Sequence, residues 1–182
     1  MYYIELGGSF QVTEQTEEPK QAKTPDLSLT SIGVLAFFAA DHVVKDEASG
    51  KLHVLGGFFN LLRFQVYPAL LPTLGIGASL HVPWHAYHQD HHFAITMLDE
   101  DRQPLPFRIE GGFRVGADIL LGHGDPSVVN IGGTVPNVMF QRPGRYRLWL
   151  TVDDEPLDSW GLHLLQLPSG LPSTAAPGTP EK

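Results

Sequence analysis

The sequence predicts an all-β protein: a two-sheet antiparallel sandwich, Ig-like or jelly-roll, with eight or nine strands. Glycine (19) and proline (15) are frequent among the 182 residues, as expected for short strands joined by turns. Turn signals recur about every 8–15 residues. No stretch keeps helical periodicity beyond about two turns. The one ambiguous run, LGGFFNLLRF at 55–64, contains a glycine pair that disfavours helix.

Alternation of apolar and polar residues locates the strands. It is clearest in FRIEGGFRV at 107–115, where one face is apolar and the other charged. We expect DEASGK (46–51), PALLP (68–72), VPWHAYHQD (82–90) and DEDRQP (99–104) to connect strands. The expected strands are 31–41, 52–59, 74–82, 91–98, 107–115, 128–131, 137–140 and 160–167, and we expect 142–150 to be a turn followed by a further strand.

The two ends differ from the middle of the chain. Residues 14–26, EQTEEPKQAKTPD, are polar and include two prolines, so they cannot bury enough apolar surface to offset their ordering entropy. We therefore expect a flexible extension over 1–28, with an added edge strand in the first twelve residues left open. The stretch 168–182 is rich in Pro, Ser, Thr, Gly and Ala and is expected to be disordered. The β domain is then 29–167.

Composition narrows the class of protein. The net charge is -8 and the pI about 5.5, which disfavours nucleic acid and anionic membranes as partners. The absence of cysteine excludes disulfides and thiolate metal sites and favours a cytoplasmic protein. The longest apolar run, Ser31–Ala40, has half of the roughly 20 residues that a membrane-spanning helix needs.

A histidine-rich loop is the first candidate site. His85, His88 and Asp90 could bind a metal ion, because imidazole and carboxylate are common ligands. His88-Gln89-Asp90 also has the H-x-D spacing of an iron facial triad. His123 or His163 would then be the third ligand, and Arg142 or Arg147 would hold a 2-oxo acid. A polar loop entering a strand explains the same histidines without a metal.

The same loop carries two aromatic residues, Trp84 and Tyr87. Aromatic side chains on a loop often anchor a partner or stack on a sugar. A lid over one end of the core would account for them equally well.

Other chemistry has little support in the sequence. The carboxylate runs at 99–101 and 153–155 fit turns, in which Asp bonds to its own backbone, and would also suit calcium. There is no G-x-S-x-G elbow, no S-x-x-K motif and no P-loop. We therefore assign no catalytic residue and expect no cofactor, apart from the possible metal.

Four stretches in order carry a resemblance: FFAADHVVKDEASGKLHVLGGFFN, VYPALLP, HVPWHAYHQDHHFAITMLDEDRQPL, and FRVG followed by RPGRYRLWLTVDDEP. Together they resemble an uncharacterised bacterial family of small β-sandwich proteins, a domain of unknown function. The resemblance implies an Ig-like or jelly-roll sandwich and no known activity. It singles out His91 among the loop histidines.

These observations favour a non-catalytic cytoplasmic protein that binds a protein partner or self-associates through Trp84, Tyr87 and His91. Two alternatives stay open: a metal-dependent enzyme centred on His85, His88 and Asp90, and a module that binds a carbohydrate or small molecule.

Overall fold

The computed structural model describes residues 31–116, 122 and 124–168. The expected extension at 1–28 and nearly all of the expected tail at 168–182 lie outside these residues, so both stay predictions.

The described residues form an all-β structure, which confirms the all-β class, but they contain ten strands where eight or nine were expected. Ten strands and one short 3-10 helix, η1, follow one another along the chain. They are β1 (Gly33–Ala40), β2 (His42–Lys45), β3 (Leu52–Leu55), β4 (Leu61–Phe64), β5 (Ala69–Val82), η1 (Trp84–Ala86), β6 (Asp90–Leu98), β7 (Pro104–Arg114), β8 (Ser127–Phe140), β9 (Gly144–Val152) and β10 (Glu155–Gln166). Within the described residues, no helix is both long and apolar enough to cross a membrane.

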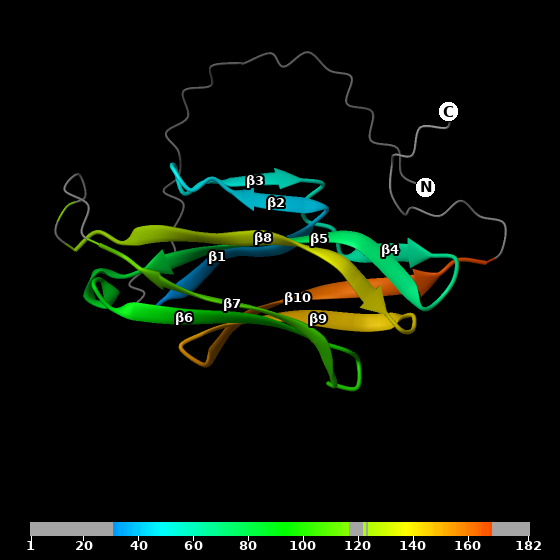
Figure 1. Ribbon diagram of the computed structural model, residues 1–182. Coiled ribbons are helices and arrows are strands. Elements are labelled where there is room, and N and C mark those ends of the chain that lie inside the picture. The colour runs from blue at the N-terminus through cyan, green and yellow to red at the C-terminus, as the bar shows by residue number, and fades with distance from the viewer. Residues whose placement is uncertain (1–30, 117–121, 123, 169–182) are drawn as a thin grey trace, which may run out of the picture.

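The strands form three sheets (Figure 1). The three-stranded sheet has the order β1-β5-β8, and the five-stranded sheet the order β4-β10-β9-β6-β7. The hairpin β2-β3 is a separate two-stranded sheet. All pairs are antiparallel except β4 with β10, which is parallel. Neither the separate hairpin nor the parallel pair was predicted.

The main core lies between the two larger sheets. From the three-stranded sheet, Leu74, Ile76 and Leu80 contribute fully buried side chains, and from the five-stranded sheet Leu148 and Leu150 do so. Their alternation with outward residues is the period of two that a strand imposes. Each of these strands therefore presents one apolar face to the core, and its other side chains point away.

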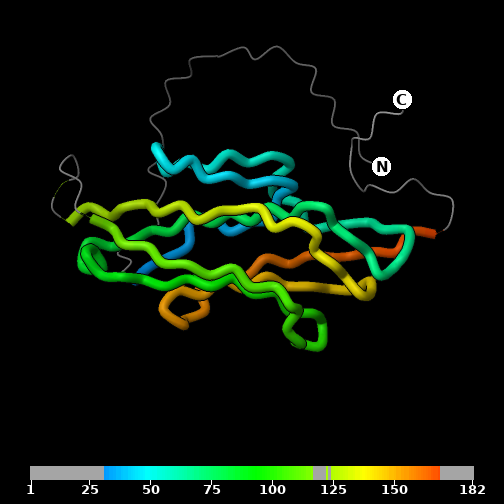
Figure 2. The backbone as a smooth tube through the Cα atoms, in the orientation of Figure 1, coloured from blue at the N-terminus to red at the C-terminus, as the bar shows by residue number. Residues whose placement is uncertain are grey.

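The hairpin β2-β3 covers the outer side of the three-stranded sheet (Figure 2). Val43 anchors it: its N–H donates to Thr134 Oγ1 at 2.9 Å, and the same hydroxyl donates to Val43 O at 2.8 Å. Gly75 permits the close approach, because a Cβ there would lie 2.7 Å from the backbone of His42 and Val43. The glycines of this sheet thus make room for a second layer.

Local signals gave the wrong length for three strands. The expected short strands at 128–131 and 137–140 are one strand, β8, which pairs with β5 along its whole length. Pro136 is tolerated because β8 is an edge strand, where one row of N–H groups has no partner. The same pairing draws 69–72, expected as a connection, into β5. The strand expected at 52–59 ends at Leu55, where Gly56 turns the chain with a φ of 60°.

Candidate functional site

The loop between β5 and β6 packs onto one end of the core. Trp84 and Tyr87 lie ring to ring, with centroids 4.9 Å apart. Tyr87 is buried with Val82, Ala86 and Val115, and its hydroxyl donates to Asp125 O at 3.2 Å. The loop therefore closes this end of the domain, as in the lid alternative that the sequence left open.

His91 connects this loop to the turn between β9 and β10. Its side chain is 7% exposed and stacks on Phe113, with centroids 5.2 Å apart. Nδ1 lies 2.7 Å from Asp153 Oδ2, and Nε2 lies 3.0 Å from Ala86 O. A carboxylate and a carbonyl both only accept hydrogen bonds, so both ring nitrogens must carry hydrogen. The geometry thus selects the charged imidazolium form.

The directions in which the pKa values of His91 and Asp153 are shifted agree with the charged form of His91. Burial opposes a charge on His91, but the hydrogen bonds to Asp153 and Ala86 and the charge of Asp153 outweigh it and raise the pKa of His91. Burial also opposes the charge on Asp153, yet the hydrogen bonds from His91 and the His92 N–H lower the pKa of Asp153. The pair is therefore an ion pair that ties two loops together.

The residues predicted to contact a partner have different positions. Trp84 is partly exposed, whereas Tyr87 and His91 are buried. A partner could reach the two buried rings only if the loop opened. Their packing and hydrogen bonds give them a structural role, and partner binding through this loop stays a prediction.

The residues of the predicted metal site are dispersed. His85, His88 and Asp90 are exposed, and Asp90 lies 3.6 Å from Arg114. Within the described part of the chain, no three His, Asp or Glu side chains converge as a metal ion would require. His123 lies outside the described residues, and His163 is on β10. The metal site therefore stays a prediction without a supporting cluster.

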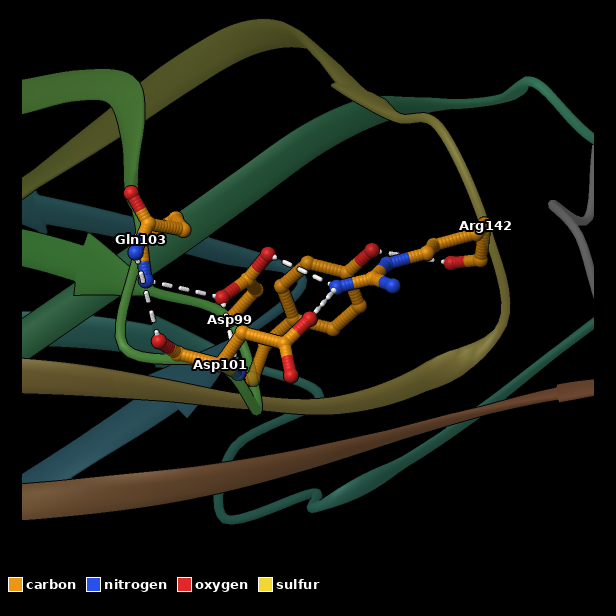
Figure 3. Close-up of polar contacts among 5 residues, drawn as sticks. Asp99, Asp101, Gln103 and Arg142 are labelled. Atoms are coloured by element: carbon orange, nitrogen blue, oxygen red, sulfur yellow. Dashed lines mark hydrogen bonds and ion pairs between the residues drawn. The ribbon is translucent and has the colours of Figure 1, made fainter.

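Arg142 binds two of the three carboxylates in the acidic turn after β6 (Figure 3). The Arg142 guanidinium donates to Asp99 Oδ2 at 3.0 Å and also bonds Asp101. Asp99 also accepts the N–H of Gln103 at 2.8 Å. This backbone hydrogen bond, followed by Arg142, lowers the pKa of Asp99. These contacts give Asp99, Asp101 and Arg142 structural partners.

The outer face of the five-stranded sheet is the surface that sequence reasoning missed. Tyr146, Leu148 and Leu150 point into the core, so alternation sends the side chains between them outward. The same rule applied to β4, β6, β7 and β10 collects basic residues on one face, which we call the arginine face. Its members are Arg63, His92, Arg108, Arg114, Arg145, Arg147 and His163.

A groove of about 970 Å³ crosses this face next to the turn after β6. Arg145, Arg147, Trp149, Gly161 and His163 are among its lining residues. Strand register places Arg145 opposite His163 and Arg147 opposite Gly161. Since Gly161 has no side chain, and a Cβ there would meet nothing within 4 Å, the groove is open beside Arg147.

The polar contacts in the groove leave its cations available. Arg147 donates to Ser159 Oγ at 3.1 Å, and its guanidinium carbon lies 5.9 Å from the Trp149 ring centroid. Among the described residues, no carboxylate forms an ion pair with Arg145, Arg147 or Arg63. The part of the groove beside Arg145 and Arg147 is therefore suited to an anionic ligand, although Asp99 and Glu100 also line the groove.

One sequence signal could have indicated this face. In RYRLWL at 145–150, the positions between the core residues are Arg, Arg and Trp, an unusual set for a face without a partner. The contribution of His163 and Gly161 could not be seen, because it depends on the register between β9 and β10.

Comparison with known proteins gives a family but no activity. No curated protein matches the chain. A family model described as a family of unknown function matches residues 35–165, which confirms the expected resemblance to an uncharacterised domain. The chain belongs to this family of unknown function, DUF6941.

Proposed function

We propose that this protein is a non-catalytic binding module whose arginine face takes an acidic protein partner. One observation carries the proposal. On the outer face of the five-stranded sheet, Arg63, Arg145 and Arg147 have no carboxylate partner among the described residues, although the chain has a net charge of -8. Unpaired cations of this kind attract an oppositely charged partner and orient it on that face.

The distribution of ion pairs supports the same proposal. Arg108 is paired with Glu110, and Arg114 lies near Asp90. Arg63, Arg145 and Arg147 are left without a carboxylate from the described chain. The acidic residues interspersed on this face oppose a nucleic-acid backbone, which requires a continuous basic surface. A protein with its own mixture of charges fits better.

We also propose that the fold is an Ig-like or jelly-roll sandwich. Two larger sheets that share one core support an Ig-like or jelly-roll sandwich. The Tyr146 hydroxyl donates to Arg142 O at 2.8 Å, a bond of the kind called a tyrosine corner in Ig-like domains. The absence of cysteine from the chain supports a cytoplasmic location.

The test is a differential pull-down with the full chain as bait. Arg145→Gln/Arg147→Gln removes two charges from the arginine face, and Lys45→Gln/Lys51→Gln removes two charges from the hairpin β2-β3. The proposal expects an acidic partner that the arginine variant loses and the lysine variant keeps, with binding that weakens as salt increases.

Two results would contradict the proposal. One is a partner retained by Arg145→Gln/Arg147→Gln but lost when Trp84 is replaced by Ala, which would locate binding at the loop. The other is a stable homodimer in light scattering that the arginine variant does not disrupt, which would favour self-association through another surface.

A further inference from the structure

The arginine face contains a linear row of side chains that defines what a partner must present. Arg145, Arg147 and Trp149 occupy alternate positions of β9 and point to the same side. Alternate residues of a strand are about 6.6 Å apart. The row therefore offers two cations and an aromatic ring on one side of the strand, with the Arg147 guanidinium carbon 5.9 Å from the Trp149 ring centroid.

An extended peptide has the same repeat. In a segment Glu-x-Glu-x-apolar, the two carboxylates and the apolar side chain also face one side, with about 6.6 Å between them. Each guanidinium can form a paired hydrogen bond with one carboxylate, and the apolar residue reaches Trp149. We propose that this row, Arg145–Arg147–Trp149, binds an extended acidic segment of a partner protein with carboxylates at alternate residues.

The neighbouring strand supports this site. His163 is directly opposite Arg145 across the β9–β10 pair, so its ring can add a hydrogen-bond donor beside the guanidinium. Gly161 leaves the space opposite Arg147 open. The floor of the groove thus admits a side chain where a larger residue would fill it.

The rim of the groove favours carboxylates over phosphates. Asp99 and Glu100 line the same groove as the two arginines. Asp99 is paired with Arg142, but the charge of Glu100, which has no ion-pair partner among the described residues, repels a doubly charged phosphate more strongly than a singly charged carboxylate. This inference rests on the proposed function, because it names the ligand of the same face.

The experiment compares peptides of the same composition by NMR titration of the intact chain. The alternating peptide is acetyl-Gly-Glu-Ser-Glu-Ser-Leu-Gly-amide, and its isomer acetyl-Gly-Glu-Glu-Ser-Ser-Leu-Gly-amide directs the two carboxylates to opposite sides. We expect the alternating peptide to bind about fivefold more tightly, the gain expected from one additional exposed ion pair. Amide shifts should cluster on β9 and β10.

Two variants test the linear row of side chains independently of the proposed acidic partner. Arg145→Gln should remove the preference for the alternating peptide, whereas Lys51→Gln should keep it. Equal binding of the two isomers, or no binding of either, would overturn the linear site, while the pull-down would still decide whether the face binds an acidic partner. Tighter binding of a phosphoserine peptide than of its glutamate counterpart would also overturn it.

Discussion

Replacement of Asp153 by Asn should reverse the pH dependence that His91 gives to stability. Asp153 accepts two hydrogen bonds, from His91 Nδ1 at 2.7 Å and from the His92 N–H at 2.9 Å. An Asn oxygen can still accept from His92, and its amide can donate to a neutral His91. Asn also tolerates the left-handed backbone of this position, where φ is 51°. The substitution therefore changes the charge without disturbing the turn.

The direction of this pH dependence follows from the coupling between proton binding by His91 and folding. In the wild type, the folded-state pKa of His91 is raised. The stability from the pair is thus fully present below the unfolded value, about 6.5, and is lost as pH rises through the folded value. In Asp153→Asn, burial without a carboxylate should lower the pKa of His91. Stability should then be lost as pH falls below about 6.5.

The size of the stability change follows from the hydrogen bond between His91 and Asp153 and from the exposure of the Asp153 side chain. A hydrogen bond between charged groups contributes about 1.5–3 kcal/mol when it is shielded from water. The Asp153 side chain is 47% exposed, and solvent screening reduces this to about 1 kcal/mol. For a domain of this size, that corresponds to a change in Tm of about 4 °C.

The assay is thermal unfolding between pH 6 and pH 8. The difference between the two melting temperatures, wild type minus Asp153→Asn, should fall by about 4 °C from pH 6 to pH 8. His88→Asn, at an exposed position of the same loop, should follow the wild type. Parallel curves for wild type and Asp153→Asn would refute the ion pair.

Two further substitutions test the packing of the hairpin and the acidic turn. Gly75→Ala should destabilise the protein by about 1–3 kcal/mol in denaturant unfolding, because its Cβ would lie 2.7 Å from the backbone of β2. Gly133→Ala, with open space around its Cβ, should change stability by less than about 0.5 kcal/mol, and equal losses would contradict the close packing. Arg142→Gln should raise the pKa of Asp99 towards its ordinary value, as measured by carboxyl NMR. Since a lowered pKa gives stability that is lost as pH falls, the variant should also lose less stability on acidification than Arg102→Gln does.

The sequence by itself determined the all-β class and much of the strand pattern. Alternation in FRIEGGFRV and RYRLWL gave strands whose apolar faces are buried, because a strand exposes alternate residues to opposite sides. The turn DEASGK was also placed correctly, although β2, the strand before it, was not predicted. These features depend on neighbouring residues only, so they can be seen without a partner strand.

Tertiary structure decided the features that join distant segments. β8 continues through Pro136 because β5 pairs with it on one side only. The pKa of buried His91 is raised because a turn 62 residues away supplies Asp153. The arginine face exists because register places His163 beside Arg145 and Gly161 beside Arg147. Pairing between strands carries this information, and local composition does not record it.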